Sequence, residues 1–376
     1  MADEKKRILE LVESGKLTVD EALKLMEKVD EVNEKKSLNE EEQKILEDFQ
    51  EEAKFHEKKK ESNPNYGFNF QAAKDKLFDF VDTTIKKVKE VDLDLNFGHF
   101  EEVSHIFQYN NISPKKLDID IPNGEVELIP WDQEEVSIEC KAKVYRVNSL
   151  EEAKKVFLKE VQVNVDDEQL VVKTNHKWMK VKTKVYIPQT SYESAIIRLF
   201  NGPITTFDVK AEKLYAKTAN GKITLNAGEN KKVEADAANG SIKVEKGNIE
   251  KLDAETINGS ISVDGYFNKV DLQSFNGSIS CTNHAETCEV LELQGTTGSI
   301  EVSLPETVAI SGELKTNFGG FNVELDGIQI IEEKSEVLQK TLQFKSIQTS
   351  DHHTKMEANT KTGSIKVKKI EKVSNY

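Results

Sequence analysis

The chain repeats an Asn-Gly dipeptide at nearly constant spacing, and this repeat restricts its fold more than any other feature of the sequence. The repeat glycine recurs at intervals of 18 to 21 residues and then, before Gly363, after a gap of 44 residues. Such a period indicates a stack of similar units, since a short unit can bury its apolar side chains only against its neighbours. We interpret the long gap as about two repeats, one of which has lost its turn. The turn dipeptides are Asn123-Gly124, Asn220-Gly221, Asn239-Gly240, Asn258-Gly259 and Asn276-Gly277, and Gly202, Gly298 and Gly319 stand in the same context.

Apolar residues alternate with polar residues on both sides of each turn. This period of two is typical of strands with one buried and one solvated face. Each unit is therefore expected to hold two short strands joined at an Asn-Gly corner, where glycine adopts a positive φ without steric cost. The apolar pairs before the turn include Leu214 and Ala216, Val233 and Ala235, and Leu252 and Ala254, and those after it include Ile223 and Leu225, Ile242 and Val244, and Ile261 and Val263.

Two architectures satisfy this pattern, a β-solenoid whose units stack in parallel and an antiparallel meander of hairpins, for which Asn-Gly is also a strong signal. The constant spacing of equivalent residues favours the solenoid, because stacking places like on like. The predicted fold is mainly β, a parallel β-helix-like solenoid over residues 115–376 preceded by an α-helical N-terminal region. Near its start we expect a helix at 150–160 and strands at 161–165, 170–174 and 181–187.

The N-terminal region carries helical signals. Residues 1–30 predict a helical hairpin, in which Thr18 and Glu21 form a capping box. A hairpin of this size buries too little surface to be stable alone. It either docks on a protein partner or second copy, or packs as a cap within the chain. The residues that would contact a partner are Leu9, Leu11, Leu25 and Met26.

Two further segments separate this hairpin from the β domain. Residues 31–60 predict a helix and linker, and residues 61–114 a linker and an amphipathic helix. The apolar stripe of the amphipathic helix suits packing or self-association better than membrane contact, because its polar face mixes aspartates with lysines.

Composition narrows the function classes. The formal net charge of −15 disfavours nucleic acid as a partner, because phosphate contacts need a basic surface. No stretch has the length or apolarity of a membrane span, and the N-terminus lacks the apolar core of a signal peptide. The expected location is the cytoplasm, with association at a membrane, a membrane protein or the cell surface as the alternative.

No catalytic, metal-binding or cofactor-binding motif stands out, so we expect neither an enzyme nor a cofactor. The weak cluster of Cys281, His284 and Cys288 is better explained by the interior repeat position of Cys281. Asp236 and Glu255 fall on equivalent positions of adjacent units, as an acid pair of a polysaccharide-cleaving β-helix would. Their neighbours Lys217 and Gln273 indicate a solvated face instead. The expected function is binding or scaffolding, and the alternative is a carbohydrate-active or carbohydrate-binding β-helix protein.

The sequence also resembles a known family in two places. Residues 8–22, Ile-Leu-Glu-Leu-Val-Glu-Ser-Gly-Lys-Leu-Thr-Val-Asp-Glu-Ala, resemble the helical hairpin at the start of envelope-stress proteins of Firmicutes. The Asn-Gly-Ser-Ile turns, together with Pro130-Trp131-Asp132, resemble the β-strand-repeat family of adhesin-like proteins. The resemblance implies a non-enzymatic role in the cell-envelope response to antimicrobial peptides or antibiotics, near membrane proteins.

Overall fold

The computed structural model describes residues 99–336, 338–347 and 352–370. All of them belong to the second of the two units into which the chain divides, Leu77–Tyr376. The described part is mainly β, as predicted, with 20 strands in one long sheet and a helix near its start. Outside it lie the expected N-terminal helices, with Leu9, Leu11, Leu25 and Met26.

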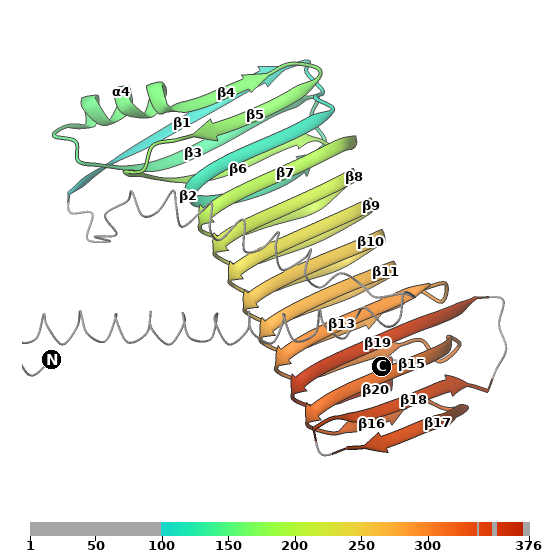
Figure 1. Cartoon of the computed structure of the whole chain (residues 1–376). Helices are drawn as coiled ribbons and strands as arrows, with labels where there is room; N and C mark the ends of the chain where they lie inside the picture. Colours follow the sequence, from blue (N-terminus) through green and yellow to red (C-terminus); the bar gives the residue numbers. More distant parts are fainter. Residues whose placement is uncertain (1–98, 337, 348–351, 371–376) are drawn as a thin grey trace, which may run out of the picture. The chain divides into compact units, whose positions relative to one another are not determined.

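The elements follow one another along the chain as Figure 1 labels them. The first are β1 (Phe100–Asn110), β2 (Lys116–Trp131), β3 (Glu135–Tyr145), α4 (Leu150–Glu160), β4 (Val161–Val165), β5 (Gln169–Thr174), β6 (Met179–Pro188), β7 (Ser191–Asn201), β8 (Ile204–Asn220), β9 (Ile223–Asn239) and β10 (Ile242–Asn258). They are followed by β11 (Ile261–Asn276), β12 (Ile279–Asn283), β13 (Val290–Thr297), β14 (Ile300–Leu304), β15 (Ala309–Phe318), β16 (Phe321–Glu324), β17 (Ile328–Ser335), β18 (Lys340–Ser346), β19 (His353–Thr362) and β20 (Ile365–Lys369).

Strands β7 to β11 run parallel, and each pairs with the next so that equivalent residues of successive repeats lie side by side (Figure 1). Asn239, for example, lies beside Asn220 on one side and Asn258 on the other. An antiparallel meander would reverse the direction of every second strand. The repeats therefore form the parallel solenoid that the constant spacing favoured.

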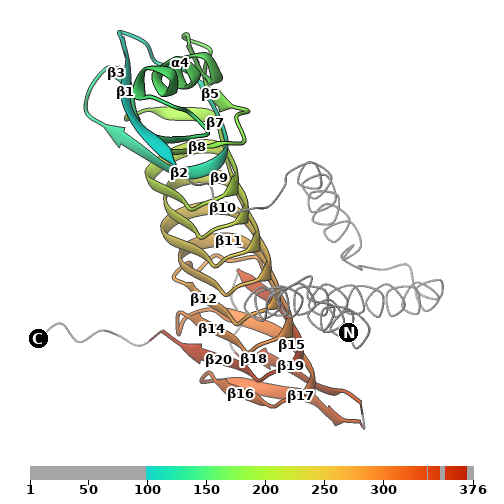
Figure 2. The same cartoon turned by 90° about the vertical axis from the view of Figure 1, so that its left-hand side faces the viewer.

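Each repeat makes one coil with two walls (Figure 2). The residues after a turn form the post-turn wall, and those before the next turn form the pre-turn wall. A shift in the pairing register, as between Phe207 and Val209, marks the bend between the walls. The coils therefore stack as repeated rungs, which gives each wall a continuous outer face.

The apolar positions of both walls point into the space between them. Leu225 and Val244 on the post-turn wall, and Val233 and Leu252 on the pre-turn wall, have no exposed surface. Burial of such a side chain contributes about 1.5–3 kcal/mol. Because like stacks on like, one core runs through the stack, and Cys281 takes the same interior position as Val263.

Glycine is required at the corners chiefly because the next coil lies so close. A Cβ atom at Gly259 would lie well inside 3.0 Å of the carbonyl oxygen of Gly240, and Gly221 and Gly240 are in the same situation. The expected positive φ occurs at Gly124 and Gly277 but was wrong for Gly221, Gly240 and Gly259, whose φ lies outside the left-handed range. Close approach of the next coil is therefore the general reason for glycine at these corners, and a positive φ is an additional reason at some of them.

The interpretation of the long gap before Gly363 is also wrong. The gap holds β17 and β18, which form an antiparallel hairpin. The chain then turns back into the stack, so that β19 lies between β13 and β15 (Figure 1), and β20 between β14 and β16 (Figure 2). The last coil in the sequence is an inserted coil in space, with parallel neighbours on both sides.

The other end is likewise out of sequence order. Strand β2 lies between β5 and β7, both of which follow it in the chain. Helix α4 and strands β4 to β6 confirm the expected elements. The boundary at residue 115 was too late, because β1 pairs along its whole length with β3 and the β structure thus begins at Phe100. The sequence of this strand hides the alternation, since His105 lies on the same side as the buried Val103 while Ile106 is 60% exposed.

We predict that Gly259→Ala lowers the stability of the β domain by about 1–3 kcal/mol, because the new methyl group must displace the backbone of the coil beside it. Urea denaturation of the full chain measures the effect. Gly320→Ala is the matched control, since a Cβ atom there meets nothing within 4 Å. Equal midpoints for both variants would contradict the close approach at Gly259.

We also predict that ending the chain at His352 abolishes cooperative unfolding of the C-terminal coils. Without β19 and β20, the partners of β13 and β15 are lost and a complete coil is missing between them. Hydrogen exchange of β13 and β15 reports the change. Removal of residues 371–376 alone leaves every described strand in place and serves as the control. Unchanged protection after the longer deletion would show that β15 can pair with β13 directly.

Candidate functional site

The turn asparagines form a hydrogen-bonded ladder along one corner of the solenoid. From Asn201 onward, each side-chain Nδ2 donates to the Oδ1 of the preceding turn asparagine, at 2.8 to 3.0 Å, and within the ladder Asn123, at its end, only accepts. Asn201 is a member that the sequence interpretation did not single out, although it forms the same dipeptide with Gly202. The ladder comprises Asn123, Asn201, Asn220, Asn239, Asn258 and Asn276.

The glycine carbonyls at these corners also have partners. The hydroxyl groups of Thr218, Thr256 and Ser274 donate to the carbonyl oxygens of Gly202, Gly240 and Gly259 at 2.9 to 3.0 Å. This explains why the residue two positions before the turn asparagine is small and often a hydroxyl residue. The corner groups thus bind one another, and they stabilise the register of the coils.

The outer face of the pre-turn wall carries charge in columns. A carboxylate recurs on six adjacent strands, five positions before the turn asparagine or before the residue that takes its place. We call this set the carboxylate column. Two positions earlier, lysine recurs on four adjacent strands, and we call this set the lysine column. The carboxylate column is Glu234, Asp253, Asp271, Glu292, Glu357 and Glu313, and the lysine column is Lys213, Lys232, Lys251 and Lys269.

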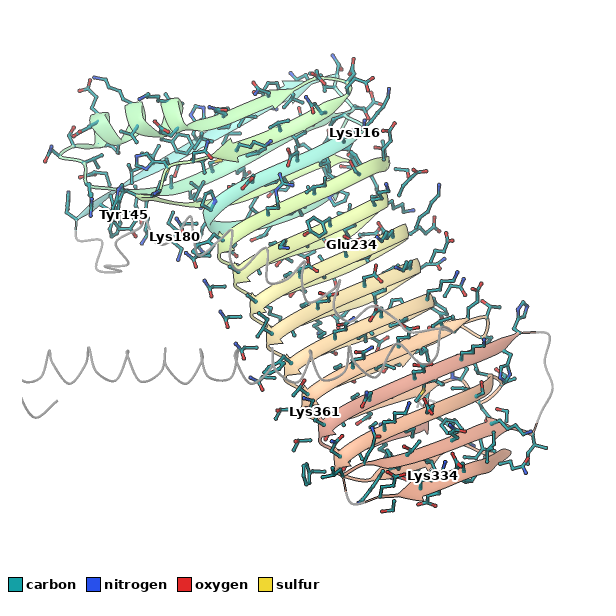
Figure 3. The ribbon with its side chains drawn as sticks, viewed as in Figure 1. Lys116, Tyr145, Lys180, Glu234, Lys334 and Lys361 are labelled. Atoms are coloured by element: carbon teal, nitrogen blue, oxygen red, sulfur yellow. The ribbon has the colours of Figure 1, made fainter. Side chains whose placement is uncertain are left out.

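Parallel stacking brings these like charges together. Adjacent strands lie about 4.8 Å apart, so the carboxylate column extends over about 24 Å. Figure 3 shows Glu234 on the outer side of the wall, with the solenoid core behind it. The sequence analysis noted Asp236 and Glu255 and missed this longer column. Counting five positions back from each turn would have found most of it, but Glu357 and Glu313 become neighbours only because β19 is an inserted coil.

The lysine column neutralises only part of the carboxylate column. Lys232 forms ion pairs with Glu234 and with Asp253, and Lys251 pairs with Asp253 at 3.1 Å. Lys269 instead pairs with Glu289 at 3.1 Å, and Val290 occupies the next position of the lysine column. Lys355 occupies this position again on β19, so the gap in the lysine column lies at Val290 and negative charge is concentrated at Asp271 and Glu292.

The pKa values follow this distribution. Burial raises the pKa of Asp271 to about 6, and the nearby carboxylates of Asp253 and Glu292 add to the rise. Burial and the neighbouring Glu357 also raise the pKa of Glu292. At Glu313 the effect of burial is outweighed by hydrogen bonds from Lys315 and Gln343, so its pKa is lowered. Protonation is thus easiest in the middle of the column.

The acid pair singled out from the sequence lies beside this column. Asp236 and Glu255 are adjacent in register, as expected. Asp236 accepts a hydrogen bond from the hydroxyl of Tyr215 at 3.1 Å and pairs with Lys217 at 3.4 Å. Burial nevertheless raises the pKa of Asp236, against the effect of Lys217. These contacts make Asp236 part of a charge network within the wall.

A small hollow in the described part of the chain lies away from the carboxylate column. This hollow, lined by Leu304, Ile310 and Ile328, has a volume of about 10 Å³, which is the space of about one water molecule. None of its lining residues belongs to the carboxylate column. The columns are instead displayed on the outer face of a wall, where each is reached from one side.

The cysteines and nearby histidine do not come together as a metal site. Cys281 and Cys288 are buried, and burial raises the pKa of the Cys288 thiol to about 12. His284 turns outward and contacts Asp264, with 2.9 Å between Nε2 and Oδ1. Within the described residues, no group of three or more His, Cys, Asp or Glu side chains has the arrangement of a metal site. No helix in this part of the chain has both the length and the apolarity needed to cross a membrane.

Comparison with known proteins gives matches along nearly the whole chain. The sequence profile of the Toastrack DUF4097 family matches residues 111–369, and that of a SHOCT-like domain matches residues 3–34. The uncharacterized protein YvlB of Bacillus subtilis strain 168 is 43% identical over 373 residues, which cover 98% of this chain and 99% of YvlB.

Two solved structures are similar in fold. One, described as a "putative adhesin" of Bacteroides fragilis, has a TM-score of 0.40 and 12% identity, and the match covers 72% of this chain and 97% of that one. The other, a "putative adhesin" of Parabacteroides distasonis, has a TM-score of 0.40 and 13% identity, with 72% and 98% covered.

We predict that Asp271→Asn stabilises the protein at pH 7.5 by about 1–2 kcal/mol, because the folded chain holds this carboxylate with a pKa raised from 3.8 to about 6. The contribution of the neutral Asp271 side chain to the free energy of unfolding is fully present below pH 4 and is lost as the pH rises through 6. The advantage of the variant should therefore shrink between pH 6.5 and pH 4. Melting curves over this range test it, with exposed Asp167→Asn as the control. A pH-independent difference would contradict a raised pKa.

Proposed function

This chain belongs to the Toastrack DUF4097 family, and from that premise we propose that it is a non-enzymatic binding or scaffold protein of the bacterial cell-envelope stress response. The observation that carries the binding role is the outer face of the pre-turn wall, where the carboxylate and lysine columns run side by side. Stacked repeats commonly use such extended surfaces for partners. The stress role rests on the resemblance of residues 8–22 and of the β repeat to envelope-stress proteins.

The geometry of the face supports binding. Its charged side chains are mounted on strands whose neighbours are hydrogen-bonded on both sides, so their positions are held by the stack. A partner gains electrostatic complementarity from the columns without having to enter a cavity, and charge patterns of this kind give specificity and fast association more than raw affinity. The under-neutralised stretch at Asp271 and Glu292 favours a partner with basic groups.

The same geometry weighs against glycan cleavage. Glycosidases place two carboxyl groups on opposite sides of the scissile bond, about 5 to 9.5 Å apart. Neighbouring carboxylates of the column have a similar spacing, but they all project from one wall. A glycan on this wall could meet them only from the same side, which does not provide an acid on one face of the bond and a base or nucleophile on the other.

Carbohydrate binding without cleavage is the second candidate. Tyr266 is 56% exposed, and its ring centroid lies 5.5 Å from that of His284, which contacts Asp264. An exposed aromatic ring beside polar groups is a suitable surface for a sugar ring. If Tyr266→Ala abolished binding to purified cell-wall glycan while charge reversal on the pre-turn wall did not, this candidate would replace the protein-binding proposal.

The partner test is a crosslinking pull-down of the full chain from antibiotic-stressed and unstressed cells, combined with membrane fractionation. We expect the pull-down to capture a membrane or membrane-associated protein, and more of it from stressed cells. Binding to such a protein would also explain recovery of this chain in the membrane fraction. Glu292→Lys with Glu357→Lys should remove most of that capture. Glu229→Lys with Glu250→Lys, an equal charge change at exposed positions outside the columns, is the matched control. If both pairs of substitutions left partner capture unchanged, the pre-turn wall would not be the binding face.

We further propose that residues 1–30 are a docking module for a protein partner or a second copy, with Leu9, Leu11, Leu25 and Met26 as the contacting residues. The match of residues 3–34 to a SHOCT-like domain supports treating this segment as a unit separate from the solenoid. Its sequence carries more apolar residues than so short a hairpin can bury on itself.

We predict that a chain starting at Ser37 melts like the full chain but loses partner capture or self-association. The reason is that the described solenoid has its own core, which includes β1 through Val103. Melting curves, sedimentation and the pull-down profile measure the outcome. Retention of every partner and of the oligomeric state would reduce the segment to a cap, and loss of folding would make it part of the β core.

A further inference from the structure

The two ends of the solenoid core differ in what covers them. At the N-terminal end, α4 lies against β1, β3 and β4 and buries Ala153 and Phe157. At the other end, β17 pairs with β18 alone and β16 with β20 alone among the described strands. Each of these two terminal strands therefore offers a backbone edge, which is a template for pairing with another strand.

Apolar side chains are exposed at the same end. Ile330 lies beside the buried Phe344 in register, so it is in line with the core, yet it is 46% exposed. Ile331 is 55% exposed, and Leu338 and Ile347 next to this hairpin are 73% and 67% exposed. A terminal unit of a solenoid ordinarily presents a polar outer surface, because nothing stacks on it. The end of the core at β17 instead has the apolar character of an internal coil.

The charges on β17 are self-complementary. Glu332 and Lys334 form an ion pair at 2.7 Å, and their register with Gln343 and Thr341 places them on the outer face of the pre-turn wall. Figure 3 shows Lys334 on this outermost strand. If a second β17 pairs antiparallel about a two-fold axis at Glu333, each Glu332 lies opposite a Lys334. The two ion pairs then join into a square of alternating charges.

We propose that the β16–β17 end of the solenoid is the interface of a closed dimer, in which β17 pairs antiparallel with β17 of a second copy of this chain. Backbone hydrogen bonds extend the pre-turn wall across the two-fold axis, and the exposed edge of each β17 is covered by the other copy. Since α4 covers the other end, β17 cannot continue onto that end of another copy. The contact is therefore isologous and closes at two chains.

The interface does not depend on the binding role proposed above. In the sequence, β17 is far from residues 1–30, and those residues offer a separate route to self-association. Glu333 of both copies meets at the axis, where like charges oppose each other. Glu333→Gln should consequently tighten the dimer, a gain that general destabilisation of β17 would not produce.

The experiment is sedimentation velocity of the full chain over a concentration series at low salt. We expect a dimer whose Kd rises about tenfold or more in Glu332→Lys and in Lys334→Glu, because each change places like charges opposite one another. An equimolar mixture of the two variants should restore dimerisation, since the two lysines of one chain then face the two glutamates of the other. Glu245→Lys on the post-turn wall of β10 is the control and should dimerise like wild type.

The mixture separates the interface from a folding effect, because an intrachain role of the Glu332–Lys334 pair cannot be rescued by another molecule. A wild-type chain that stays monomeric overturns the proposal. So does a dimer that is unchanged in both single variants, or one that the mixture fails to restore. A dimer lost on removal of residues 1–36 but unaffected at β17 would place self-association in the N-terminal segment and overturn the β17 interface alone.

Discussion

The separation between neighbouring coils is the constraint on which the rest of the structure depends. Parallel pairing sets it at about 4.8 Å, and at the corners the backbone of one coil lies directly on the next. A side chain on Gly221, Gly240 or Gly259 has no room there. The Asn ladder follows from the same spacing, because it brings each amide within hydrogen-bond distance of the amide in the adjacent coil.

The same stacking that builds the core imposes a cost outside it. Like lies on like on both faces of the wall, which is favourable for Leu252 on Val233 and unfavourable for Asp271 beside Asp253. The lysine column offsets this repulsion over part of the wall. At Asp271, burial and then the carboxylates of Asp253 and Glu292 raise the pKa. Such a column does not stabilise the fold by itself. A partner that meets the charged face, as in the binding role proposed here, would offset this cost.

The ends of the solenoid depend on strands that are not consecutive in the chain. β2 enters between β5 and β7, and β19 enters between β13 and β15. An inserted coil requires its neighbours on both sides before it can bury its apolar side chains. Ion pairs hold the inserted β20 to both flanking strands, as with Lys368 to Glu301 and Lys366 to Glu324.

The sequence by itself determined the repeat, the inward positions of Ile223, Ile242 and Ile261, and the helix at 150–160, because alternation and spacing are local properties that survive in any context. Only the tertiary structure decided the order of the coils, since a strand pairs in parallel with any matching edge and the spacing does not say which one. That order decided which carboxylates became neighbours, as with Glu357 between Glu292 and Glu313. It also decided that β17 remained at an open edge, because an inserted coil took the position that sequence order would have assigned to the end.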